Sequence, residues 1–179
     1  MHDRLYSPPA FALAAGLTML AIGAVTGAVL IGLQDWLYAM ARAEIIRRPE
    51  VHGFAGAEVI DAGRIAEVAD QSNAALRMLH THSLGLGMLI LLGTMAVVNL
   101  PIPIWSRPVL CVFISIGAVY PIGWLVLAWL IPYWGVDRLR RPVEWLLFLP
   151  FGGALALGLC GALGLYLVGL VRRLLARPK

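Results

Sequence analysis

Four long runs of apolar residues occupy most of this chain and limit what it can fold into. They cover about residues 11–33, 82–100, 108–131 and 143–171. A helix rises about 1.5 Å per residue, so roughly 20 residues cross a hydrocarbon core about 30 Å thick. We therefore predict an all-α membrane protein. Its single domain, residues 1–179, holds four transmembrane helices in an antiparallel bundle.

The composition fits a chain whose solvent is lipid. It is 60% hydrophobic and only 13% charged, with a mean hydropathy of +0.83, whereas a soluble domain carries about 25% charged residues. The net charge of +4 does not indicate nucleic acid, because arginines such as Arg138 and Arg172 flank apolar runs, where they meet lipid headgroups. We expect an integral protein of a bacterial-type inner membrane. Its expected partners are lipid and other membrane subunits, with no nucleic acid.

The polar connections give the remaining expectations about the fold. Residues 34–81 form the long extramembrane segment, and within it 58–79 lacks proline and repeats apolar residues at near-helical spacing. We predict an amphipathic helix there, which lies on the membrane surface or runs straight into the second span. Residues 137–141 are predicted to be a loop. Pro121 interrupts the third run, and we expect a kink beside it.

Small residues recur at four-residue spacing in two of the runs. Gly23 and Gly27 form such a pair in the first run, and Ala154, Gly158 and Ala162 form a row in the fourth. Small residues at this spacing allow another helix to approach closely. We expect both sets to lie at helix contacts.

The triplet His80-Thr81-His82, where the second run begins, is the one place at which the sequence suggests chemistry. Imidazole is the commonest metal ligand in proteins. If the triplet is helical, side chains two residues apart point about 200° apart around the axis. His80 and His82 then face opposite sides and cannot share one metal ion, but each can ligate a haem of its own.

An extended triplet has a different consequence. Alternating side chains would then place His80 and His82 on the same side. With His52 and a carboxylate such as Glu58 or Asp61, they would form a small copper or zinc site. A third interpretation involves no cofactor: the histidines anchor the helix at the membrane interface or hydrogen bond to a neighbouring helix. The sequence leaves all three open.

The triplet at the entrance of an apolar helix resembles the His-x-His of the haem-copper oxidase family, whose two histidines ligate two different haems. The resemblance covers His80, Thr81 and His82 alone. The many spans and the copper-ligating histidines of that family are not found in the 179 residues. The resemblance implies haem as the group bound by His80 and His82.

The sequence holds no Walker A, GxGxxG, HExxH or GxSxG motif, and its polar segments are short, so we expect no catalytic activity of its own. We expect a small integral subunit of a larger respiratory or electron-transfer complex, which scaffolds partners and lipid. The sequence does not identify a cofactor: haem is possible, and copper or zinc is less favoured. Two alternatives are an autonomous haem- or metal-binding membrane protein and a small oligomeric transporter or channel.

Overall fold

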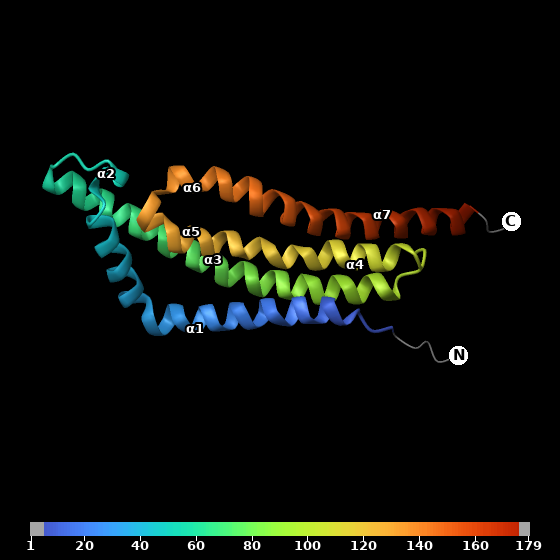
Figure 1. The fold of residues 1–179 in the computed structure, drawn as a ribbon. Helices are drawn as coiled ribbons and strands as arrows, with labels where there is room; N and C mark the ends of the chain where they lie inside the picture. The colour runs from blue at the N-terminus through green and yellow to red at the C-terminus, as the bar shows by residue number, and fades with distance from the viewer. Residues whose placement is uncertain (1–5, 176–179) are drawn as a thin grey trace.

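All regular structure in the described part of the chain, residues 6–175 of a computed structural model, is helical (Figure 1). The elements are α1 (Ala10–Ile46), α2 (Pro49–His52), α3 (Glu58–Asn99), α4 (Ser106–Ile116), the 3₁₀ turn η1 (Gly117–Val119), α5 (Tyr120–Trp134), α6 (Val136–Val143), the π-helical segment η2 (Glu144–Gly152) and α7 (Gly153–Leu175).

Four helical stretches are long and apolar enough to cross a membrane. They are Ala10–Ile46, Glu58–Asn99, Ser106–Trp134 and Val136–Leu175. Large apolar side chains such as Ile31, Leu92 and Leu157 lie exposed on them, as suits helices that face hydrocarbon tails. The prediction of an all-helical chain with four potential spans is confirmed, and it is consistent with an integral membrane protein.

The long helices lie side by side, with α3 between α1 and the α4–α5 stretch and α7 beyond that stretch (Figure 1). Helix α3 packs against α1, α4 and α5, and α7 packs against α4. One buried cluster joins Ile90 and Val97 of α3 to Ile114 of α4 and Leu155 of α7. A second cluster, towards the α2 end, includes Leu127 and Ile131 of α5. Helix α3 therefore contacts three of the other long helices, α1, α4 and α5.

The helices extend beyond the apolar runs. The first helix continues past residue 33 to Ile46. Of the two courses predicted for residues 58–79, the structure has the one that runs straight into the second span: α3 continues without interruption from Glu58 to Asn99, because no proline interrupts its hydrogen bonds. The predicted loop 137–141 is helical and belongs to α6. Its acidic residue stands in the first turn and two arginines stand in the last, which matches the helix dipole.

Two prolines shape the third span. At Pro121 the helix tightens into η1, because Pro121 has no N–H for the Gly117 carbonyl and the N–H of Tyr120 takes that carbonyl instead. The predicted kink is thus a short 3₁₀ turn. Further on, Pro132 lacks the N–H that would bond the Ala128 carbonyl. The hydroxyl of Ser72 on α3 donates to that carbonyl at 2.6 Å.

The start of α3 is tied to the turn before it by one carboxylate. The Asp61 oxygens accept hydrogen bonds from the main-chain N–H groups of Ala55 and Gly56, both at 2.9 Å. A carboxylate in the first turn also suits the positive end of the helix dipole. Asp61 thereby orders the connection between α2 and α3.

Replacing Asp61 with alanine should free this connection. We expect amide hydrogen exchange over residues 53–57 to become about tenfold faster or more, because two charge-assisted hydrogen bonds are lost. The matched control is Asp70→Ala, an exposed acid on the same helix. Equal exchange in both variants would contradict the proposed role.

Candidate functional site

The side chain of His80, a residue of α3, points towards α1. Its Nδ1 is 2.7 Å from the Gly23 carbonyl oxygen of α1. The ring lies against Gly27, where an added Cβ would be only 2.6 Å from His80 Cε1. The Gly23 and Gly27 positions thus make room for the imidazole as well as for the approach of α3.

His82 faces a different neighbour. Its Nδ1 is 2.9 Å from the Met78 carbonyl one turn earlier in α3. Its ring centroid is 5.5 Å from each of the Tyr120 and Trp124 rings of α5. The two histidines therefore point to opposite sides of α3, as the helical interpretation of the triplet predicts.

The partners of the two imidazoles define which nitrogen carries the proton. A carbonyl oxygen can only accept, so Nδ1 must be the donor in both His80 and His82. In a neutral imidazole the other nitrogen, Nε2, then has a free lone pair. Both rings are held in orientation by the main chain and keep Nε2 for a ligand or a donor.

The extended interpretation of the triplet is contradicted, because residues 80–82 lie within α3. His52 is buried near the opposite end of α5, with its Nε2 3.0 Å from the Pro132 carbonyl, and the Asp61 carboxylate is engaged with main-chain amides. Within residues 6–175, no three side chains of the His, Cys, Asp and Glu types are grouped so that they could hold a metal ion. The structure does not bring His52 together with His80 and His82.

A cavity of about 560 Å³ opens beside His80 between α1 and α3. Gln34, Asn73 and Arg77 supply its polar lining, and Gly27 and Ile31 are among its apolar lining residues. Gln34 belongs to α1, and Asn73 and Arg77 belong to α3, about two turns and one turn before His80. A group bound to Nε2 of His80 would thus lie close to one cationic and two amide side chains.

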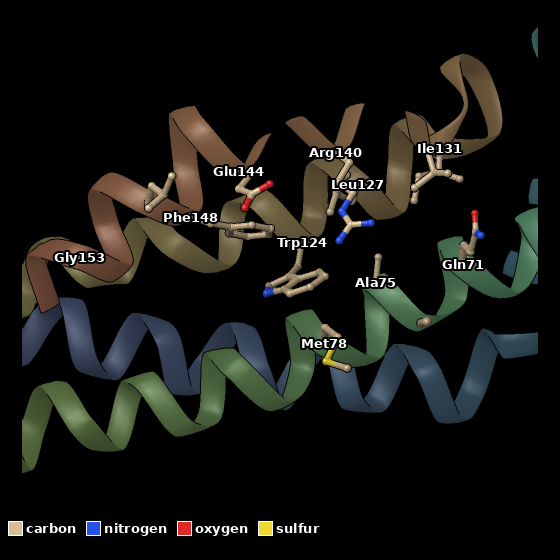
Figure 2. A pocket seen from close by; sticks show the side chains of 13 residues that line it. Gln71, Ala75, Met78, Trp124, Leu127, Ile131, Arg140, Glu144, Phe148 and Gly153 are labelled. Carbon is tan, nitrogen blue, oxygen red and sulfur yellow. The ribbon is translucent and has the colours of Figure 1, made fainter. Parts of the chain in front are cut away.

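A groove of about 670 Å³ lies on the other side, between α3, α5 and the α6–η2 segment. We call it the Trp124 groove. Trp124, Leu127, Met78 and Phe148 are prominent in its apolar wall, and Arg140 and Glu144 are its charged lining residues. Figure 2 shows the Arg140 guanidinium directed towards α3 and the Glu144 carboxylate above the Phe148 ring.

Aromatic rings connect this groove to His82. The Phe148 ring is 4.8 Å from that of Tyr120 and 4.7 Å from that of Trp124, centroid to centroid. Together with His82 these residues form a cluster of four rings. Of these four residues, only His82 was predicted from the sequence as a site residue. The i, i+4 spacing of Tyr120 and Trp124 was a usable signal, but nothing in the sequence places Phe148 against them.

The small residues predicted to mediate packing lie against neighbouring helices to different degrees. An added Cβ at Gly23 would be 2.7 Å from Leu84 of α3, and one at Gly158 would be 2.7 Å from Ile114 of α4. Ala162 is buried and Ala154 is half-buried. At Gly158 the α7 row comes into close contact with α4.

No family model, curated protein or solved structure matches this chain. Its class therefore follows from the fold alone: an all-helical protein with four helices able to span a membrane. The features that bear on its function are His80, His82 and the two cavities beside them.

Proposed function

We propose that this chain is a small integral subunit of a respiratory or other electron-transfer complex in a bacterial-type inner membrane, with its four spans in an antiparallel bundle. In this proposal His80 and His82 bind a redox cofactor, with haem the first candidate. Lipid and other membrane subunits cover its apolar outer surface.

The observation that carries the proposal is the shared hydrogen-bonding state of the two imidazoles. Each donates Nδ1–H to a main-chain carbonyl, at 2.7 Å for His80 and 2.9 Å for His82. Ligating histidines characteristically donate their second ring N–H to such an acceptor, which fixes the ring and makes the ligating nitrogen more basic. Because the two rings face opposite sides of α3, they serve two separate groups, or one group of this chain and one of a partner.

The surface supports the role of a subunit. Exposed residues such as Trp129 and Trp134 of α5 and Trp145 of η2 stand near the polar connections, where tryptophan is favoured at membrane interfaces. The polar stretch between the first two apolar runs consists of the ends of α1 and α3, the four-residue helix α2 and short connections. A chain of this kind supplies a cofactor environment and contact surfaces to larger partners.

The test is the reduced-minus-oxidised visible spectrum of the chain, recorded in native membranes and after purification in mild detergent. We expect a sharp haem α-band that falls about tenfold or more in the double variant His80→Ala/His82→Ala, because loss of an axial ligand removes most haem affinity. Each single replacement should remove only the part of the band that comes from the haem its own histidine ligates. Thr81→Ala is the matched control, since within residues 6–175 the Thr81 hydroxyl bonds only to carbonyls of its own helix. A band that survives both histidine replacements would contradict the assignment of the ligands.

The same preparations separate a subunit from an autonomous protein. A subunit should migrate with larger partners in native electrophoresis of mild detergent extracts and lose cofactor or stability when isolated. If the chain migrates alone from native membranes, the proposal of a larger complex is wrong, even if haem is bound.

A further inference from the structure

One wall of the Trp124 groove is formed by a π-helical segment, η2. Segment η2 is π-helical over nine residues, whereas π-helical turns are rare, mostly single, and frequent at functional sites. It contributes Glu144 and Phe148 to the groove, opposite Met78 and Ala75 of α3. Helix α3 packs closely on α5 but not on η2. The groove therefore lies open between two helices that α5 holds apart.

The lining of the groove suits a flat, mostly apolar molecule. Its volume of about 670 Å³ lies within the range of sites for small organic ligands, which are apolar with a few polar groups. Trp124 and Phe148 present aromatic rings to it. Aromatic side chains favour offset or tilted stacking with another ring.

The charges of the groove argue against a phosphate head group. Arg140 and Glu144 are opposite in sign, so the lining is neutral as a whole. Neither residue forms an ion pair in the part of the chain that the structure describes. The Arg140 guanidinium is thus available as a donor to a neutral acceptor, while the Glu144 carboxylate would repel a phosphate.

We propose that the Trp124 groove binds the head ring of an isoprenoid quinone. The ring stacks on Trp124 or Phe148, a quinone carbonyl accepts a hydrogen bond from Arg140, and the isoprenoid tail leaves the groove towards the lipid. The choice of a quinone rests on the proposed electron-transfer function. The groove residues are distinct from the histidines, so binding is testable by itself.

Gly153 is a position at which a larger side chain can be introduced beside the groove. It lines the groove, and an added Cβ there meets no atom within 4 Å. Gly164 on the same helix is equally open but lies away from the groove. Gly153→Phe and Gly164→Phe are therefore a matched pair of variants.

The experiment is a titration of the full chain in mild detergent with decylubiquinone, followed by quenching of tryptophan fluorescence. We expect saturable quenching in the wild type and in Gly164→Phe, and about tenfold or more weaker binding in Gly153→Phe, whose side chain takes the place of the ring. Arg140→Gln should weaken binding about fivefold, and Arg138→Gln, on the same helix but not lining the groove, should not.

Two results would overturn the proposal. One is quenching that does not saturate or that is equal in the two phenylalanine variants. The other is displacement of decylubiquinone by phosphatidylglycerol at equal or lower concentration, which would make the groove a phospholipid site. His80→Ala, on the side of α3 away from the groove, distinguishes this proposal from the proposed function. A weaker haem band with an unchanged quinone titration separates the two sites, and failure of either test leaves the other result standing.

Discussion

Gly87→Ala is expected to lower the melting temperature of the purified protein by about 5–10 °C, which corresponds to about 2–3 kcal/mol of overpacking in a chain of this size. An added Cβ at Gly87 would be 2.8 Å from Leu20 Cγ and 2.9 Å from the Gly16 carbonyl oxygen of α1. The leucine can rotate away, but the carbonyl belongs to a helix backbone. Helices α1 and α3 must therefore separate along their contact.

The control for this variant lies two residues away. An added Cβ at Gly85 meets nothing within 4 Å, so Gly85→Ala should leave the melting temperature unchanged or raise it slightly, as alanine is the better helix former. Thermal unfolding in one detergent, followed by far-UV circular dichroism, compares the two variants. Equal melting temperatures would show that α1 and α3 are not as close as described.

Ser72→Ala is expected to lower the free energy of unfolding by about 1–3 kcal/mol, because it leaves the buried Ala128 carbonyl without a donor. The Ser72 hydroxyl supplies that donor at 2.6 Å in place of the N–H that Pro132 lacks. The effect is large for the loss of one hydroxyl group, since Ser72 and Ala128 are both buried.

Ser83→Ala is the control for Ser72→Ala. Ser83 is fully buried on the same helix, and its hydroxyl has no hydrogen-bond partner within residues 6–175. Its replacement should be neutral or stabilising. A double-mutant cycle with Pro132→Ala sharpens the test, because alanine at 132 restores the helical N–H. Ser72→Ala should then cost less by about 1 kcal/mol, and strictly additive effects would contradict the compensation.

The spans were predictable because hydropathy and length act locally. Apolar runs of the required length indicate helices whatever their neighbours. The ends of the helices were less predictable: α1 and α3 both extend far into the polar stretch 34–81. Hydropathy marks where the lipid ends, but a helix continues into water as long as its hydrogen bonds are unbroken.

The candidate site was predictable only in part. Helical geometry alone implies that His80 and His82 face opposite sides, and the structure has them so. Their partners could not be predicted, because Gly23 and Tyr120 approach α3 from distant parts of the chain. The Trp124 groove depends on the π-helical course of η2, for which the sequence holds no recognised pattern.

The length of α3 has a mechanical consequence. Its 42 residues amount to about 63 Å of helix, twice the thickness of a hydrocarbon core of about 30 Å. In a bilayer the Glu58 end would emerge from the lipid as a rod that is continuous with the turn that carries both imidazoles. A partner that rotates this end of α3 in the aqueous phase would also rotate the turn that carries His80 and His82. The helix would thus couple an event in water to the positions of the two imidazoles.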